Sequence, residues 1–343
     1  MKKKKKNAQH SPKRRVSQKK STYRTRNWKK YNAALVARGS LTVWVEAGAL
    51  SSWRNQQLSG RRGASLTYND VAILTALTLK VVYRLPLRAT QGLLGSILCL
   101  MGATHLPVPD YSTLSRRQKT LKVALPRQLQ ARPGQALHLV VDSTGCKIYG
   151  EGEWKVRQHG YSKRRTWRKL HIGVNEASGE ILAAVLTTND VADSAVLPDL
   201  LEQIEEPLAQ MSGDGGYDKR SCYEALRRRQ TQQGAGERAE QALRVTIPPR
   251  HGARIWQHGN RKVERLARDE NLRRIRQIGR APWKSESGYH RRSLVETTMF
   301  RIKSIFGDKL SARCIEAQAA EVFIRCAALN KMTSLGMPDS YAL

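Results

Sequence analysis

The pattern of apolar and polar positions divides the chain near residue 133. Between about residues 31 and 127, apolar side chains recur every three or four positions, most clearly in 66–87, where the pattern ends at Pro86. This spacing is typical of amphipathic helices, and two further short helices are expected at 87–100 and 111–121. The last of these is basic, so the segment suits a helix-turn-helix DNA reader, although a plain helical packing domain fits the same pattern.

After Pro133–Gly134 the pattern changes to the alternation that is typical of β-strands. Helical patterns separate the later strands, at about 194–205 and 217–230, and a further helix at 315–332 is expected to cover the sheet. This order indicates an α/β sheet, antiparallel at its start and parallel afterwards, in the outline of an RNase H-like fold. The five expected strands are 137–143, 169–175, 179–187, 209–213 and 243–247.

The chain is strongly basic. Its 343 residues include 61 Lys and Arg against 28 Asp and Glu, a formal net charge of +33, which suits a polyanionic partner such as nucleic acid. Residues 1–30 hold fourteen of these cations, no acid and few apolar side chains. We therefore expect a disordered arm that contacts phosphates without reading bases, with a solubilising tail as the alternative.

Missing motifs exclude several classes of protein. No uninterrupted apolar run is long enough to cross a membrane, and the basic N-terminal tract lacks the apolar segment of a signal peptide. The five cysteines form no CxxC pair, and both HExxH and Walker-type phosphate-binding motifs are absent from the sequence. We expect a cytosolic protein with reduced thiols that is neither a zinc protease nor a P-loop ATPase.

Three carboxylates occupy positions where an active site is expected. Asp142 closes the apolar run 137–141, and Asp214 follows the strand that ends at Gly213. Acids just beyond strand ends lie at the rim where α/β sheets bind ligands, although either Asp alone is as readily a turn former or a helix cap. With Glu296 on a later helix, the three would repel one another unless a cation were present.

Such a cluster predicts a divalent metal site. Oxygen ligands that leave room for a phosphate favour Mg²⁺ or Mn²⁺, and two such ions support an in-line displacement at a phosphodiester. In a protein of this charge, the site predicts an enzyme that cuts or joins DNA.

The segment 289–310 is expected to form a basic helix around Glu296. Residues seven apart lie within about 20° of each other on a helix, so Tyr289 and Lys303 share a stripe with this acid, and Arg292 lies one turn before it. A solvated helix whose Glu pairs with Arg292 or Lys303 is the alternative. Phe300 falls outside the apolar arc. That arc comprises Val295, Met299, Ile302, Ile305 and Phe306, with Leu294 at its edge.

Four of these residues reproduce the signature Y-(2)-R-(3)-E-(6)-K of bacterial insertion-sequence transposases of the DDE type. The four are Tyr289, Arg292, Glu296 and Lys303. With VVDSTG at 140–145, WRKLHIGV at 167–174 and SGDGGYD at 212–218, the chain resembles the insertion sequence five family over essentially its whole length. The resemblance implies an RNase H-like catalytic domain, divalent-metal catalysis, and action on the inverted repeats at the ends of a mobile element.

The resemblance also implies roles for individual residues. Asp142, Asp214 and Glu296 would be the catalytic residues and would ligate Mg²⁺ or Mn²⁺, with two ions expected. Basic stretches at 161–169 and 250–292, the second with thirteen Lys or Arg against four acids, are expected to line a DNA channel. The expected DNA-binding residues are Tyr289, Arg292, Lys303, Arg164, Arg165, Arg168 and Lys169.

Other residues in these regions allow two interpretations. Three tryptophans are interleaved with Arg in these stretches: Trp167, Trp256 and Trp283. Each could stack on an unpaired base at a cut end. Packing within the protein is the more common role of Trp at such positions. The additional acids near the expected rim are interpreted as turn or capping residues. These acids are Asp190, Asp193 and Asp218.

The sequence thus predicts a transposase that binds the terminal inverted repeats of an insertion sequence, cleaves DNA and transfers the strand to target DNA. The alternatives are an RNase H-like nuclease without strand transfer and a non-catalytic basic DNA-binding protein. A homo-oligomer, dimer or higher, is expected on DNA in the bacterial cytoplasm, associated with the nucleoid and not with a membrane. The expected parts are a disordered arm (1–30), a helical DNA-binding domain (31–132), the catalytic domain (133–335) and a tail (336–343).

Overall fold

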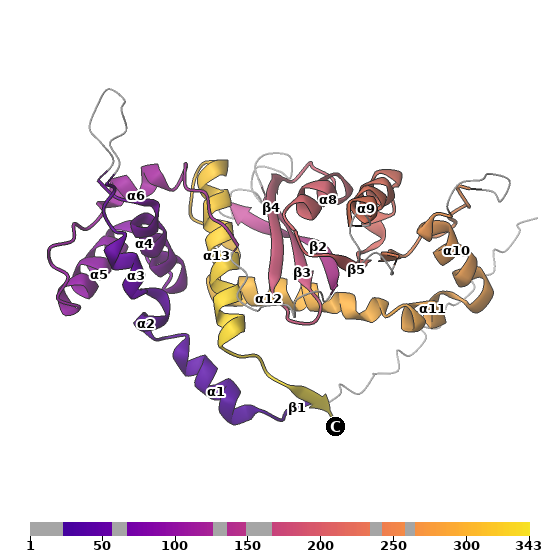
Figure 1. The fold of residues 1–343 in the computed structure, drawn as a ribbon, viewed down its shortest axis with the longest axis horizontal. Coiled ribbons are helices and arrows are strands. Elements are labelled where there is room, and N and C mark those ends of the chain that lie inside the picture. Colours follow the sequence, from indigo (N-terminus) through magenta and orange to yellow (C-terminus); the bar gives the residue numbers. More distant parts are fainter. Residues whose placement is uncertain (1–22, 57–66, 126–135, 149–166, 234–241, 258–264) are drawn as a thin grey trace, which may run out of the picture.

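A group of short helices and a mixed β-sheet lie on opposite sides of a long helix, α13 (Ile315–Leu335) (Figure 1). None of the described helices combines the length and the apolarity needed to cross a membrane. The computed structural model describes residues 23–56, 67–125, 136–148, 167–233, 242–257 and 265–343.

The described chain begins inside the segment expected to be a disordered arm. Strand β1 (Tyr23–Thr25) pairs antiparallel with strand β8 (Ser340–Ala342), and helix α1 (Trp28–Ala37) follows. The partner strand lies at the far end of the sequence, so a local pattern does not predict this pairing. The prediction of an arm at residues 1–22 concerns positions outside the described residues.

Helix α1 and the five described helices between it and the sheet form what we call the helical unit. Helix α4 begins where the Asn69 side chain accepts a hydrogen bond from the Asp70 amide, and Pro86 precedes α5, so both starts follow local sequence signals. In α6, the Asp110 side chain accepts from the Ser112 amide. The bounds are α1, then α2 (Leu41–Trp44), α3 (Ala47–Ser51), α4 (Asp70–Val82), α5 (Leu87–Leu100) and α6 (Tyr111–Arg117).

The sheet has the strand order β4-β3-β2-β5-β6. The first three strands are antiparallel, and β5 and β6 continue the sheet in parallel, which confirms the expected RNase H-like arrangement. A two-residue strand, β7 (Lys309–Leu310), also pairs with β2 and is too short to show a periodic pattern. The five main strands are β2 (Leu137–Ile148), β3 (Trp167–Asn175), β4 (Ile181–Thr188), β5 (Leu208–Ser212) and β6 (Arg244–Thr246).

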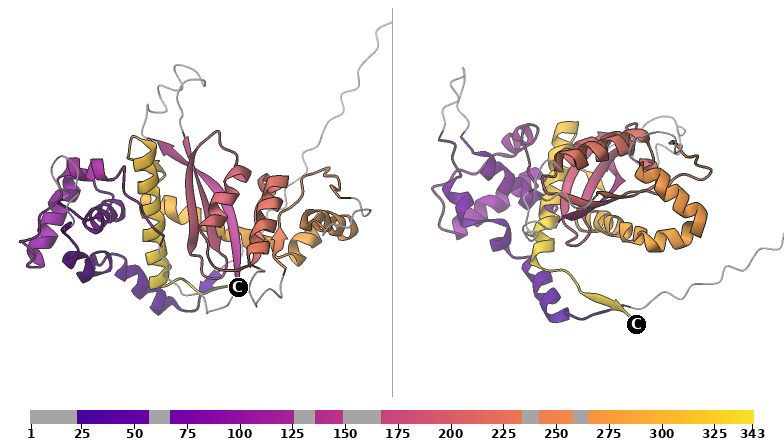
Figure 2. Two further views of the ribbon diagram at one scale, coloured as in Figure 1. Left: turned by 45° about the horizontal axis from the view of Figure 1, so that its top comes forward. Right: turned by 45° about the vertical axis from the view of Figure 1, so that its right-hand side comes forward.

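Helices cover both faces of the sheet (Figure 2). One face packs against α8 (Asp193–Glu202) and α9 (Arg220–Gln233), and the other packs against α12 (Ser293–Phe306) and α13. Strand β2 contributes alternate side chains to the two cores. Val141 is buried with the α8 and α9 side chains, whereas Val140 is buried with Val295 of α12 and with side chains of the helical unit.

A basic extension precedes α12. It comprises α10 (Ala267–Ile278), α11 (Arg280–Glu286) and a short 3-10 helix, η2 (Tyr289–Arg292). The sequence pattern indicated only a basic stretch here, because α10 has a low share of apolar side chains. Most of residues 267–292 are therefore folded as helices as well as being a source of positive charge.

Candidate active site

Asp142 lies in the middle of strand β2 and not at its end. The expected strand stops at residue 143, but β2 continues to Ile148 because its second half pairs with β3, up to the pair Lys147 and Trp167, and with β7. On its other edge β2 pairs with β5, and the last pair is Val140 with Ser212. Asp142 therefore lies just beyond the end of β5, on the face of the sheet that α12 covers.

Asp214 follows the end of β5, as the sequence predicts. Its side chain accepts a hydrogen bond of 2.8 Å from the Gly216 amide and caps the 3-10 helix η1 (Gly215–Tyr217). A Cβ atom on Gly216 would lie 2.8 Å from the Asp214 Oδ1 atom, so a side chain at this position would displace the Asp214 carboxylate. The turn-capping interpretation and the rim position are both correct for Asp214.

Arg292 joins the other two acids. Its Nη1 atom donates to Asp142 Oδ2 at 2.9 Å, and its Nη2 atom donates to Glu296 Oε1. Glu296 lies in the first turn of α12, one helical turn after Arg292, and its side chain remains half exposed. The ion pair between Glu296 and Arg292 was one of the two pairings expected for a solvated helix, and here the same guanidinium also holds a partly buried carboxylate of strand β2.

Burial raises the pKa of the Asp142 carboxyl above its ordinary value. The negative charges of Asp214 and Glu296 raise it further, while Arg292 lowers it. Burial opposes the charged form of Arg292, but the Tyr289 hydroxyl and the three acids together raise the pKa of the guanidinium. The Asp142 carboxyl thus lies close enough to Asp214 and Glu296 for their charges to raise its pKa, and Arg292 provides the positive charge among the three acids.

Tyr289 reaches this cluster from η2. The helix α12 does not extend back to it, because Gly288 adopts a left-handed conformation (φ 69°) and a 3-10 turn follows. The expected continuous stripe from Tyr289 to Lys303 is therefore wrong at its first member. The Tyr289 ring nevertheless lies beside the site, with the Arg292 guanidinium carbon 5.7 Å from the ring centroid and Trp283 packed behind it at 6.1 Å.

Lys303 lies two turns after Glu296 on α12, partly exposed. Val295, Met299, Ile302 and Phe306 of the same helix are buried, whereas Phe300 is 69% exposed. This confirms the predicted apolar arc and the exclusion of Phe300 from it.

Two of the other expected DNA-binding residues, Arg168 and Lys169, are less favourably placed. Arg164 and Arg165 lie outside the described residues. Arg168 donates to the Gln318 side chain of α13 at 2.9 Å, and Lys169 pairs with Asp193 at 2.7 Å. Because both side chains on β3 have partners within the protein, they are weaker candidates for phosphate contacts than the sequence indicates.

The tryptophans of the basic stretches pack within the protein. Trp283 is 2% exposed. The Trp256 ring lies in an edge contact with Tyr223 and beneath the Arg268 guanidinium, whose central carbon is 3.7 Å from the ring centroid. The Trp167 ring lies against Gly145 of the neighbouring strand. Packing explains these positions without a stacked base.

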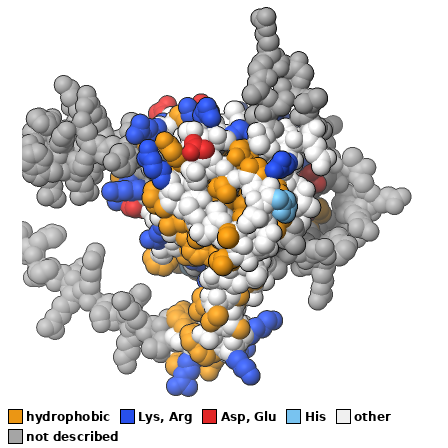
Figure 3. Space-filling model, turned by 90° about the vertical axis from the view of Figure 1, so that its left-hand side faces the viewer, with side chains coloured by type: hydrophobic (Ala, Val, Ile, Leu, Met, Phe, Trp, Pro, Cys, Tyr) orange, Lys and Arg blue, Asp and Glu red, His pale blue; other side chains and the backbone are white. Residues whose placement is uncertain are grey.

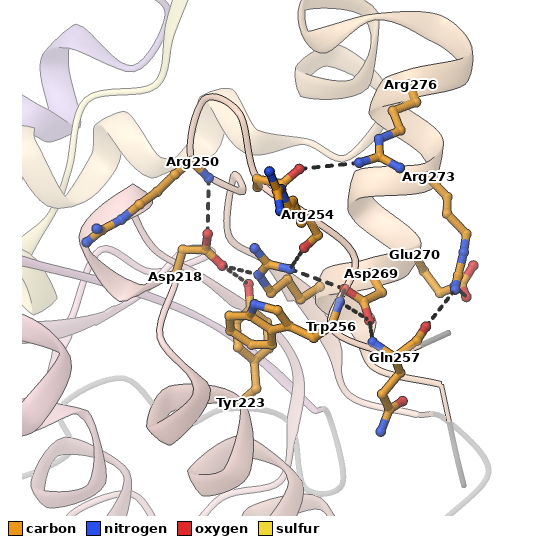
Figure 4. A network of polar contacts seen from close by, with 12 residues as sticks. Asp218, Tyr223, Arg250, Arg254, Trp256, Gln257, Asp269, Glu270, Arg273 and Arg276 are labelled. Atoms are coloured by element: carbon orange, nitrogen blue, oxygen red, sulfur yellow. Dashed lines mark hydrogen bonds and ion pairs between the residues drawn. The ribbon is translucent and has the colours of Figure 1, made fainter. Parts of the chain in front are cut away.

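A buried ionic network joins Asp218 to Arg268 and Asp269 (Figure 4). Asp218 accepts from Arg268 Nε at 2.7 Å and from the Arg250 amide at 3.0 Å. Arg268 also pairs with Asp269, whose carboxylate accepts from the amide of Trp256. Asp218, Arg268 and Asp269 are 5%, 3% and 1% exposed, so Asp218 is much more than a turn residue.

This network fixes two parts of the site to each other. Asp218 is four residues after Asp214, and Arg268 belongs to α10, in the extension that leads to Tyr289 and Arg292. The sequence shows the second Asp of SGDGGYD, but its partner is 50 residues away, without a regular spacing that would reveal it. The network therefore positions the extension against the turn that carries Asp214.

The sheet order and the carboxylates near its rim define an RNase H-like enzyme site, and the comparison with known families specifies the class. Two family profiles, both described as "Transposase DDE domain", match residues 36–151 and 133–331. The second match spans more than half of the chain, which belongs to the DDE transposases. Proteins of this family act on DNA in transposition and generally use divalent metal ions. The chain matches no solved structure.

The fit of the site to a metal ion depends on Arg292. Carboxylate oxygens are suitable ligands for Mg²⁺ or Mn²⁺. Within the described part of the chain, however, no three His, Cys, Asp or Glu side chains are grouped closely enough to hold one ion. The guanidinium of Arg292 lies between Asp142 and Glu296 and provides a positive charge between these two carboxylates.

Proposed function

We propose that this transposase binds the terminal inverted repeats of an insertion sequence, hydrolyses the phosphodiester at each 3′ end, and uses the freed 3′-hydroxyl to attack target DNA. One observation carries the proposal. In an RNase H-like sheet, the Arg292 guanidinium donates hydrogen bonds to both Asp142 and Glu296. Asp214 lies close enough to this pair to raise the pKa of Asp142. The Y-(2)-R-(3)-E-(6)-K spacing supports membership of the insertion sequence five group.

Asp142, Asp214 and Glu296 are proposed to hold Mg²⁺ or Mn²⁺, two ions in the active complex. When bound, such ions lower the pKa of an attacking water or hydroxyl and stabilise the leaving oxygen. The donor chemistry fits, and Arg292 is proposed to release at least one carboxylate as the site fills. The freed guanidinium has the planar donor geometry that binds a DNA phosphate.

The neighbouring residues are proposed to hold the DNA strand. Lys303 offers a compact positive charge for a phosphate, and Tyr289 offers a hydroxyl and a ring face beside Arg292. The surface of the helical unit carries Lys and Arg side chains around exposed apolar ones (Figure 3), which suits contacts with the terminal repeat. We further propose that the protein acts as a dimer or higher oligomer on DNA, in the cytoplasm and near the nucleoid.

Strand transfer distinguishes this proposal from a nuclease. A labelled duplex that ends in the terminal repeat, incubated with the protein, Mg²⁺ and an unlabelled plasmid, is expected to yield label joined covalently to the plasmid. Cleavage without joined product would indicate the RNase H-like nuclease. Binding without either product would indicate a non-catalytic DNA-binding protein.

Replacing Lys303 is expected to reduce cleavage without reducing stability. In Lys303→Ala the lost phosphate contact should lower the single-turnover cleavage rate by about tenfold or more, because the attacking group is less well aligned. The melting temperature should hardly change, since an ion pair of a lysine near the surface contributes at most about 1 kcal/mol. Lys309→Ala, which removes an exposed lysine six residues along, is the control. A large loss of stability with normal cleavage would assign Lys303 a structural role.

Deleting residues 2–20 is expected to weaken binding to all DNA about equally. This segment contributes positive charge without acids, and phosphate contacts release counterions whatever the sequence of the DNA. The dependence of the binding constant on salt concentration should therefore become less steep. If binding to the terminal repeat fell while binding to unrelated DNA did not, the arm would read sequence.

A further inference from the structure

Helix α4 ends in a conformation that normally requires glycine. The Leu85 amide donates to the Lys80 carbonyl at 2.9 Å and the Arg84 amide donates to the Val81 carbonyl at 3.4 Å, which is the hydrogen-bond pattern of a Schellman motif. The residue at its left-handed position is Arg84, with φ 52°. Among the described residues it is the one non-glycine residue with a positive φ, and such a residue carries a steric penalty that glycine avoids.

The side chain of Arg84 caps the end of α12. Its Nε and Nη2 atoms donate to the carbonyls of Ile305 and Ser304, both at 2.8 Å. The last four carbonyls of a helix have no partner within the helix, and in α12 the Lys303 carbonyl accepts from the Gly307 amide. Arg84 thus satisfies two of the remaining three, and a cation at this end also interacts favourably with the helix dipole.

A second contact fixes the same junction. Lys80, one turn before Arg84 on α4, donates to the Ser311 hydroxyl at 2.7 Å. The Glu321 carboxylate of α13 accepts from the Ser311 amide and hydroxyl, and Arg325 donates to the Gly307 carbonyl at 2.9 Å. The C-terminal end of α4 therefore holds the last turn of α12 through Arg84 and the segment that follows α12 through Lys80.

We propose that Arg84 is a positioning residue for the catalytic helix, through which the helical unit fixes the orientation of α12 and of Glu296 and Lys303 upon it. This inference rests on the proposed function of that site. The steric penalty at Arg84 is then explained by the capping contacts, which glycine cannot make. Cleavage depends in this way on a residue of the helical unit that contacts α12 at the opposite end from Glu296.

The test compares the full-length wild type with Arg84→Gly, which relieves the backbone and removes the guanidinium. Lys122→Ala, which removes one exposed charge from the region just after the helical unit, is the control. In Arg84→Gly, hydrogen–deuterium exchange in 293–307 should become about tenfold faster, because the end of α12 frays without its cap. The melting temperature should stay at or above that of the wild type, since the strained residue is gone.

The same variant is expected to cleave about tenfold more slowly at saturating DNA, with an unchanged dissociation constant for the terminal repeat, because a misplaced group slows the reaction without weakening binding. Unchanged exchange in 293–307, or an unchanged cleavage rate in an active protein, would overturn the proposal. A wild-type protein that does not cleave would instead contradict the proposed function. The exchange measurement would then still test whether Arg84 holds the end of α12.

Discussion

Asp142→Asn, Asp214→Asn and Glu296→Gln are each expected to abolish detectable cleavage. Each change replaces a charged oxygen ligand by an amide of nearly the same size, so metal binding is lost while the shape of the site is kept. Binding to the terminal repeat should remain close to that of the wild type, because no positive charge is removed. Cleavage of an end-bearing duplex and its binding by gel shift are measured on the same preparations.

The control for these variants is Asp199→Asn, which neutralises an exposed acid on α8 away from the site. It should cleave normally. Ordinary cleavage by any one of the three site variants would remove that residue from the catalytic set. Loss of binding together with cleavage would show that the carboxylate supports the fold of the DNA site, and would leave its catalytic role unsupported.

Asp218→Ala is expected to lower the free energy of unfolding by about 3–5 kcal/mol, which is the usual cost of leaving a buried ion without its partner. Arg268 would keep its position at 3% exposure with Asp269 as its one remaining carboxylate partner among the described residues. The Arg250 amide and the Tyr223 hydroxyl would also lose an acceptor. Urea denaturation of the wild type and the variant gives the difference.

Asp70→Ala provides the comparison, because Asp70 also pairs with an arginine, Arg117, but its side chain is 65% exposed. Removing this acid should cost no more than about 1 kcal/mol. Equal losses in the two variants would mean that the Asp218 network contributes no more than a surface ion pair. The proposed link between the Asp214 turn and the α10 extension would then have no energetic support.

The sequence predicts the main strands well because each has an alternating or continuous apolar pattern of its own. Strand β7 and the pair β1 and β8 are only two or three residues long, so their pairing depends on partners distant in sequence. The same reason explains β2, whose second half is polar and is extended by β3 and β7. Local periodicity cannot predict a strand segment whose extended conformation depends on hydrogen bonds to neighbouring strands.

In the candidate site, too, features with local sequence signals could be predicted and contacts between distant residues could not. The placing of Asp214 after a strand and of Glu296 on a helix beside Arg292 could be predicted, because turn glycines and helical spacing are local signals. The contact of Arg292 with Asp142 joins residues 150 positions apart. No local sequence pattern marks Arg84 as a residue with a positive φ. Such features become visible only when the fold brings distant segments together.

The proposed function requires that this protein cut DNA with a metal ion at the ends of its element. The most direct measurement is cleavage of a supercoiled plasmid carrying both terminal repeats, with Mg²⁺, with Mg²⁺ and excess EDTA, and with Mg²⁺ on a plasmid without the repeats. We expect new 3′-hydroxyl ends at the repeat termini in the first reaction alone. Equal cleavage in EDTA, or cuts at positions unrelated to the repeats, would contradict this function.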